Sequence, residues 1–162
     1  MNATRPSAHF LLSHPAHFLA LGFGSGLAPI APGTFGTLVA IPIAALLRAH
    51  AGDVSFAAVI VLLFATGAWA AQLTGRHLGV ADHGSIVIDE VAAFLLVLYF
   101  VGGEPLHVLI AFVLFRVFDI VKPPPIRQVD AVWKNGAGVM ADDLLAAAYT
   151  LLVFALGRWL LR

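Results

Sequence analysis

The chain alternates between long hydrophobic runs with few or no charges and short polar segments. The clearest run covers residues 54–73, about twenty residues, which is the length that crosses a hydrocarbon core of roughly 30 Å. Shorter hydrophobic runs cover residues 35–48, 86–101, 106–122 and 143–161. The pattern therefore predicts an all-α fold, a polytopic membrane helical bundle with four to five hydrophobic helices.

Two segments near the N-terminus depart from the spanning pattern. Residues 10–21 are apolar but contain Pro15, which predicts a short interfacial or buried helix that is not a cleaved signal peptide. Residues 22–36 contain five glycines and two prolines, which predicts a loop, with Thr34 as the N-cap of the next helix. We expect the whole chain, residues 1–162, to form a single domain.

Composition supports the membrane assignment and excludes several classes of function. Hydrophobic residues make up 60% of the chain and charged residues 11%, far from the usual quarter charged. The net charge is zero, which gives no argument for a nucleic-acid partner. Cysteine is absent, which excludes disulfides, zinc–thiolate sites and thiol nucleophiles.

The basic residues predict an orientation in the membrane. If the five runs span, one side holds the N-terminus and the segments 22–36, 74–85 and 122–142, with the basic residues Arg5, Arg76, Lys122, Arg127 and Lys134. The other side holds Arg48, Arg158 and Arg162, offset by Asp53 and Glu104. The excess of Lys and Arg predicts that the first side, which also carries the unusual motifs, faces the cytoplasm.

Carboxylates are the candidate chemical groups. The chain has nine acidic residues, and six of them are candidates for a site: Asp82, Asp89, Glu90, Asp119, Asp142 and Asp143. The last five lie within about a turn of helix ends that face the same side. A charge at membrane depth costs about 2.5–3.5 kcal/mol, and clustered carboxylates repel one another. A hard divalent cation removes both problems, and ligands that are all oxygen favour Mg²⁺ or Mn²⁺. Asp130, in a polar loop, is expected to be solvated.

Structural roles also fit some of these acids. Asp142 and Asp143 would suit the start of a helix, where capping and the helix dipole favour carboxylates. Asp119 could pair with Arg116 or Lys122, each three residues away on a helix.

Several other groups could serve a phosphate. Arg116 and Lys122 offer cationic donors for phosphate oxygens. The backbone N–H groups at Gly33 and Thr34, before a predicted helix, could add to them. His83, beside Asp82 in the sequence, is a candidate acid–base group.

Four segments, taken together, resemble the signatures of the phosphatidylglycerophosphatase A family. They are GFGSGLAPIAPGTFGTL at 22–38, DHGSIVIDE at 82–90, FRVFDIVKPPPI at 115–126 and GAGVMADDLLAA at 136–147, in the family's order and spacing. Ala93, Asn135 and Ala137 depart from the glycines expected there, and every charged position is kept. The resemblance places the family's acidic positions at Asp82, Asp89, Glu90, Asp119, Asp142 and Asp143 and its basic positions at Arg116 and Lys122.

The resemblance implies a bacterial inner-membrane enzyme that uses Mg²⁺ to remove the terminal phosphate of phosphatidylglycerophosphate, leaving phosphatidylglycerol. We hypothesise that one or two Mg²⁺ are held by Asp89, Glu90, Asp119, Asp142 and Asp143, and that a further carboxylate or His83 protonates the leaving oxygen. Two other classes remain open, a transporter or proton relay and a lipid-binding protein without catalysis. A transporter would place acids near the membrane midplane, whereas these lie near one end.

Overall fold

Within residues 5–160, which the computed structural model describes, every regular element is a helix. The elements are α1 Ala8–Leu12, α2 Pro15–Ala20, the 3₁₀ helix η1 Gly22–Leu27, α3 Pro32–His50, α4 Asp53–Leu78, α5 Ile88–Val101, α6 Pro105–Val121, α7 Ile126–Val132 and α8 Gly136–Leu160. The predicted helical bundle is confirmed, with five long hydrophobic helices. The predicted end of the last span, Leu161, lies outside the described residues.

Helix α5 forms the centre of the bundle. Its apolar positions run around the whole helix, so that it packs against α3, α4, α6 and α8 at once. Phe94 and Leu95, on different faces of α5, are both fully buried. The first turn of α5, which carries Asp89 and Glu90, is therefore enclosed by neighbouring helices.

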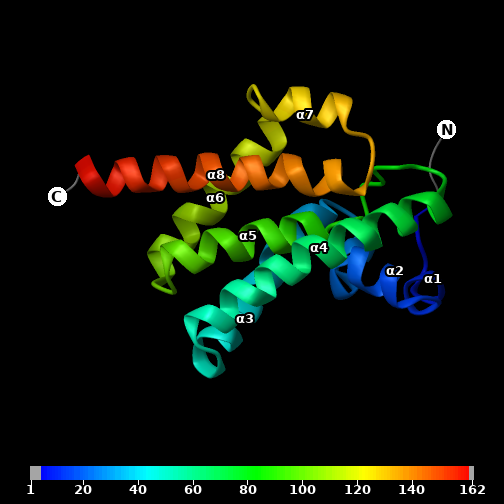
Figure 1. Ribbon diagram of the computed structural model, residues 1–162, viewed down its shortest axis with the longest axis horizontal. Coiled ribbons are helices and arrows are strands. Elements are labelled where there is room, and N and C mark those ends of the chain that lie inside the picture. The colour runs from blue at the N-terminus through cyan, green and yellow to red at the C-terminus, as the bar shows by residue number, and fades with distance from the viewer. Residues whose placement is uncertain (1–4, 161–162) are drawn as a thin grey trace.

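The long helices alternate in direction, which collects particular helix ends on one side (Figure 1). The starts of α3, α5 and α8 lie at the same end of the bundle as the ends of α4 and α6. The short helices α1, α2 and α7 also lie toward that end, which we call the site end. The turns between α3 and α4 and between α5 and α6 lie at the opposite, distal end.

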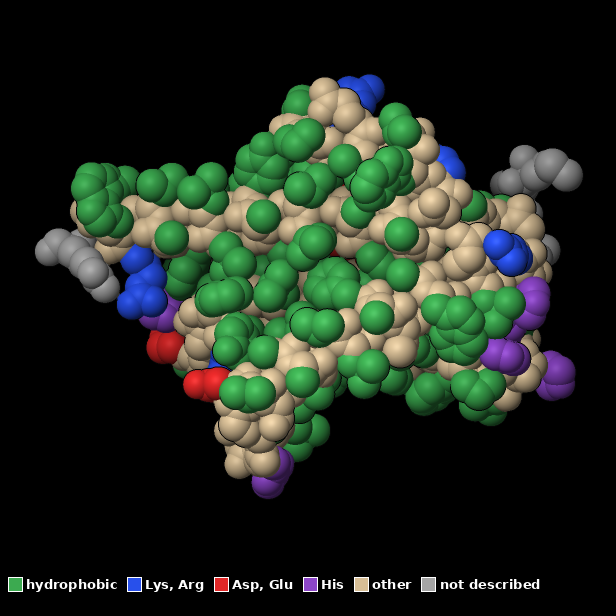
Figure 2. Space-filling view, in the orientation of Figure 1, with side chains coloured by type: hydrophobic (Ala, Val, Ile, Leu, Met, Phe, Trp, Pro, Cys, Tyr) green, Lys and Arg blue, Asp and Glu red, His purple; other side chains and the backbone are tan. Residues whose placement is uncertain are grey.

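Among the helices of residues 5–160, three, α3, α4 and α8, are long and apolar enough to cross a membrane. Helix α5 has 14 residues and α6 has 17, so at 1.5 Å per residue they reach about 21 and 25 Å, short of a hydrocarbon core of roughly 30 Å. Hydrophobic side chains cover the middle of the face shown in Figure 2, while charged and histidine side chains gather toward its edges and near α7. This surface fits a membrane-associated helical protein.

The N-terminal third contains more helix than the sequence predicts. Residues 10–21 form parts of two helices, because Pro15 starts α2 and the Nδ1 atom of His14 accepts a hydrogen bond from the Ala16 N–H. The expected loop over residues 22–36 contains η1 and the first turn of α3. The prediction of Thr34 as N-cap is wrong: α3 begins at Pro32, whose fixed φ suits a first helical position, after Ala31 in the left-handed conformation.

The segment between α6 and α8 also differs from the prediction. Proline stops α6 as expected, and Lys122 caps its end in the left-handed conformation with φ of 46°. The following segment forms α7 where only a polar loop was expected. Helix α8 begins at Gly136, so Asp142 and Asp143 lie well inside it and its first turn holds no acid. Helix capping therefore does not explain these two carboxylates.

Candidate active site

Three carboxylates from two helices meet at the site end. Asp89 and Glu90 lie in the first turn of α5, and Asp143 lies on α8, which packs beside it. Each of the three offers an oxygen that lies within 4.8 Å of the others. Asp89 is 8% exposed and Asp143 only 2%. The prediction that acids distant in the chain converge at one edge therefore matches this geometry for these three residues.

Several carboxylate oxygens of these three residues and of the neighbouring Asp142 lack a hydrogen-bond partner among the described residues. They are buried, and they belong to Asp89 (Oδ1), Glu90 (Oε2), Asp142 (Oδ1) and Asp143 (Oδ2). An ionised carboxylate removed from water costs several kcal/mol unless it is paired. Nearly buried oxygens that converge without a donor are suited to a hard cation such as Mg²⁺ or Mn²⁺. The residues present therefore fit a divalent metal.

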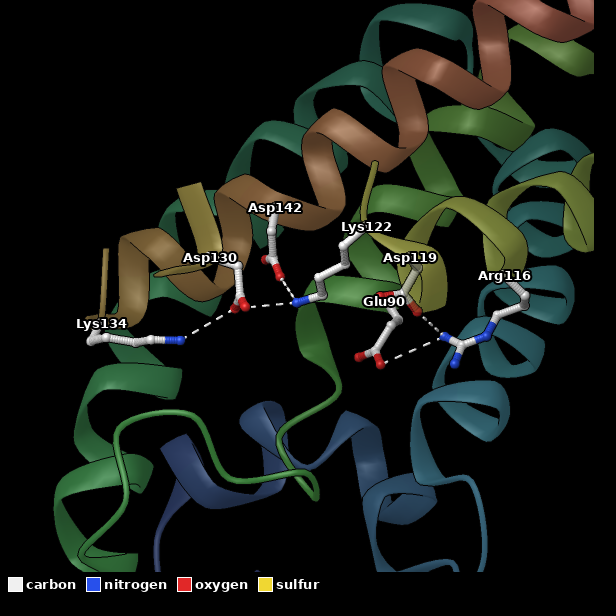
Figure 3. A network of polar contacts seen from close by, with 7 residues as sticks. All are labelled: Glu90, Arg116, Asp119, Lys122, Asp130, Lys134 and Asp142. Carbon is white, nitrogen blue, oxygen red and sulfur yellow. Dashed lines mark hydrogen bonds and ion pairs between the residues drawn. The ribbon is translucent and has the colours of Figure 1, made fainter. Parts of the chain in front are cut away.

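Arg116 forms one boundary of the cluster (Figure 3). Its Nη1 atom lies 2.5 Å from Asp119 Oδ2 and 3.7 Å from Glu90 Oε1. The same nitrogen donates a hydrogen bond of 3.4 Å to the Thr37 hydroxyl oxygen. The expected pairing of Asp119 with Arg116 is present. Arg116 Nε is buried and has no partner in the described part of the chain, so one donor of the guanidinium is left over.

Lys122 forms the other boundary. Its ammonium lies 2.5 Å from Asp142 Oδ2 and 3.2 Å from Asp130 Oδ1, and Lys134 lies 3.4 Å from the same Asp130 oxygen (Figure 3). Burial alone would lower the pKa of Lys122, but its contacts with both aspartates outweigh burial and raise that pKa. Burial would raise the pKa of Asp130, and the two lysines lower it instead. The side chain of Asp130 is 29% exposed, so it stays partly solvated as expected, but α7 also brings it to Lys122, a pairing that the sequence did not predict.

The charges of the cluster do not balance. Five carboxylates, those of Asp89, Glu90, Asp119, Asp142 and Asp143, gather around two cations, Arg116 and Lys122. If all are ionised, three negative charges remain uncompensated. A bound divalent cation would offset two of them, and a second would make the site attractive to an anion.

Gly33 lies directly against the cluster. A Cβ atom added there would come within 2.0 Å of Glu90 Oε1 and 3.3 Å of Arg116 Nη1. The Gly33 carbonyl accepts a hydrogen bond of 2.9 Å from the hydroxyl of Thr37, which is fully buried. The first turn of α3 therefore leaves room for Glu90 and supports Arg116. The sequence reasoning missed Thr37, although its place one turn after Gly33 on the predicted helix was a usable signal.

The remaining candidates lie at the margin. Thr34 is partly buried in the first turn of α3, next to Gly33. Asp82 is exposed in the segment before α5. His83 is buried, and its Nδ1 atom accepts a hydrogen bond of 3.1 Å from the Ser85 N–H, so a neutral ring carries its proton on Nε2. Neither Asp82 nor His83 belongs to the group of three acids that lie within metal-binding reach.

The fold and the site together define a class: a polytopic helical membrane protein with, at one end, a buried group of carboxylates that can bind a divalent cation. The sequence model of a family described as phosphatidylglycerophosphatase A matches residues 18–158. The chain therefore belongs to the phosphatidylglycerophosphatase A family, as its four motifs predicted.

Individual relatives agree with this assignment. A phosphatidylglycerophosphatase A of Haemophilus influenzae is 42% identical over 163 residues, covering 99% of this chain and 100% of that protein. One of Escherichia coli is 40% identical over 136 residues, covering 83% of this chain and 78% of that protein. A Bacteroides thetaiotaomicron relative, 39% identical over 88% of this chain and 93% of its own length, is provisionally named a phosphatidylinositol-3-phosphatase. No solved structure matches the chain.

Proposed function

We propose that this protein is a Mg²⁺-dependent lipid phosphatase that hydrolyses phosphatidylglycerophosphate to phosphatidylglycerol and inorganic phosphate. The observation that carries the proposal is the convergence of Asp89, Glu90 and Asp143, with partnerless buried oxygens, beside Arg116 and Lys122. Family membership and the names of two relatives supply the reaction.

Asp89, Glu90 and Asp143 would hold the ion, with Asp119 and Asp142 close enough to contribute through water or after rearrangement. When bound, Mg²⁺ neutralises phosphoryl oxygens and lowers the pKa of a coordinated water. In the hydrolysis, the oxygen of a water molecule bonds to phosphorus as the bond from phosphorus to the glycerol oxygen breaks. One proton of that water ends on the leaving glycerol oxygen, and the other stays on the inorganic phosphate.

The two cations hold the phosphate. Arg116 is fixed by Asp119, Glu90 and Thr37 and keeps a buried Nε donor without a partner among residues 5–160. Lys122 has three donors, and the contacts to Asp142 and Asp130 use two of them. Lys122 can therefore donate to a phosphate oxygen without leaving its carboxylates, and the positive charge of Arg116 lies on the other side of the cluster, which favours the developing charge of the transition state.

We further propose that the site faces the cytoplasm at the inner membrane of a bacterium. The loops at the site end carry more Lys and Arg than those at the distal end, as the positive-inside rule requires. A lipid can then keep its tails in the bilayer while its headgroup reaches the carboxylates at the site end of the bundle. Grouping of the acids at one end also disfavours a transport path, which needs charges near the midplane.

The test is phosphate release from the purified protein in detergent micelles. The substrates are phosphatidylglycerophosphate, phosphatidic acid, phosphatidylinositol 3-phosphate and a water-soluble phosphomonoester, each with Mg²⁺ or with chelator. The inositol lipid belongs in the set because of the name of one relative. We expect phosphatidylglycerophosphate to be preferred and chelation to abolish release.

Variants connect the activity to the site. Asp89→Asn and Asp143→Asn should each lower kcat by at least about 10²-fold, the scale of losing one electrostatic contact to a transition state. Asp53→Asn is the matched control, because Asp53 is exposed at the distal start of α4. Lipid binding without any hydrolysis would support a non-catalytic protein, and ion uptake by proteoliposomes without phosphate release would support a transporter.

A further inference from the structure

A continuous groove runs along the outside of the bundle between α3 and α6. Two adjoining cavities of about 390 and 410 Å³ share Ile41, Gly103 and Val108 in their linings. We call their union the α3–α6 groove, and its walls include Leu38, Ile41, Ala45, Arg48, Val108 and Phe112. Both helices pack against α5, and Leu98 of α5 lines one of the cavities. Apart from Arg48, the side chains of the walls are apolar.

The end of the groove lined by Leu38 and Phe112 lies next to the active site. On α3, Leu38 directly follows Thr37, and on α6, Phe112 lies four residues before Arg116, one turn away on the same face. Thr37 and Arg116 contact each other at 3.4 Å, so the two walls meet where the acidic cluster begins. A molecule lying in the groove would therefore have one end beside the phosphate-binding cations.

The lower end of the groove is closed by Arg48. The Arg48 guanidinium donates a hydrogen bond to the Leu98 carbonyl in the last turns of α5 and lies 5.7 Å from the centre of the Phe56 ring. From Thr37 to Arg48 the helix rises about 16 Å at 1.5 Å per residue. One leaflet contributes about 15 Å to a hydrocarbon core of roughly 30 Å, so the groove is about as long as one acyl chain.

We propose that the α3–α6 groove is the binding site for one acyl chain of the substrate lipid, which thereby places its phosphate at the acidic cluster. This inference rests on the proposed lipid phosphatase function. The surrounding lipid is as apolar as the groove, so burial itself contributes little. The groove acts by packing one chain in a fixed place, which limits the positions open to the glycerol backbone and the phosphate.

The test fills the groove with a bulky side chain and compares two substrates. Ala45→Trp places an indole in the groove from an exposed position on α3. The matched control is Ala155→Trp on α8, also exposed, which fills an apolar cavity of about 270 Å³ at the distal end, away from the site. The substrates are phosphatidylglycerophosphates with dioleoyl and with dihexanoyl chains.

Ala45→Trp should lower kcat/KM for the dioleoyl lipid by about 10-fold or more, because a displaced chain misplaces the phosphate by an ångström or so. The dihexanoyl lipid, whose chains are too short to fill the groove, should be hydrolysed as by the wild type. Ala155→Trp should leave kcat/KM unchanged for both substrates. Equal losses on both substrates, no loss on either, or the same chain-length effect from Ala155→Trp would overturn the proposal.

A binding measurement separates this inference from the proposed function. A phospholipid with a photoreactive group along one acyl chain is irradiated with the protein, and labelled peptides are identified by mass spectrometry. We expect labels on α3 and α6 that Ala45→Trp removes, whether or not the lipid is hydrolysed. Labels spread over α4 and α8 would indicate bulk lipid and contradict the proposal. An oligomer that Ala45→Trp dissociates would contradict it too, by assigning the groove to a second copy of the chain.

Discussion

Replacing Gly33 with alanine should inactivate the protein without unfolding it. The added Cβ would lie 2.0 Å from Glu90 Oε1, while ordinary van der Waals contact begins at 3.4 Å, so the carboxylate must move by about 1.4 Å. Glu90 can make that movement cheaply because the colliding atom is the end of a flexible side chain. Alanine also favours helix over glycine by up to about 1 kcal/mol, so the unfolding free energy should change by less than about that amount.

Activity should respond much more strongly. Displacement of a catalytic group by 1 Å can cost about 10²-fold, or about 2.7 kcal/mol of activation free energy. We therefore expect Gly33→Ala to lower kcat for phosphatidylglycerophosphate by about 10²-fold and to raise the Mg²⁺ concentration needed for half-maximal rate. Phosphate release in micelles measures the first effect, and thermal unfolding followed by circular dichroism verifies the fold.

Gly157→Ala provides the control, because the Cβ added there meets no atom of residues 5–160 within 4 Å. It should leave kcat close to that of the wild type and raise the melting temperature by no more than a few degrees, because alanine favours helix over glycine by up to about 1 kcal/mol. If Gly33→Ala keeps its full kcat and its Mg²⁺ dependence, the position of the Glu90 carboxylate does not matter for turnover, and the reasoning from this contact is refuted.

Three further predictions follow from single contacts. Thr37→Val should lower kcat by about 10-fold and Thr37→Ser should keep it, whereas Thr150→Val, which loses a similar buried hydroxyl that bonds only a backbone carbonyl of its own helix, should not affect phosphate release. Burial and the charge of His77 lower the pKa of His17 below 6.5 in the folded protein, so the unfolded chain takes up a proton on His17 at a higher pH than the folded chain does. The melting temperature should therefore be highest above pH 6.5 and fall as pH drops below it. This fall should be less steep in His17→Gln. Tyr149→Phe removes a hydrogen bond of 2.8 Å to a carbonyl in the proline segment and should destabilise the protein by about 1 kcal/mol or less, with faster amide exchange in α7.

Hydrophobic patterning predicts the five long helices because each is a run of apolar residues whose burial or membrane insertion requires no knowledge of its neighbours. The ends are less predictable. Helix α8 begins seven residues before the predicted start at 143, in a segment whose glycines disfavour helix. There Gly136 packs against the backbone of α4, where an added Cβ would lie 2.0 Å from the Ala68 carbonyl oxygen. Tertiary packing thus decides the start of α8.

The three carboxylates that converge were among the six candidates named from the sequence, but their division into groups was not predictable. An apolar chain gives each of its few carboxylates a strong energetic signal, which is why Asp89, Glu90 and Asp143 were included. Which carboxylates pair with cations depends on side-chain directions in the folded bundle. Helix α7 is too short and polar to be predicted from periodicity. It brings Asp130, an acid expected in a loop, into the ion-pair network of Lys122.

The central claim is that Asp89, Glu90 and Asp143 bind a divalent cation that the reaction requires. The most direct measurement titrates Mn²⁺, a paramagnetic substitute for Mg²⁺, into metal-free wild-type protein and Asp143→Asn, following free Mn²⁺ by electron paramagnetic resonance and phosphate release in the same samples. We predict that wild-type binding and activity rise together and that Asp143→Asn weakens both by at least about 10-fold. Full activity of the metal-free protein, or equal Mn²⁺ binding by Asp143→Asn, would contradict the claim.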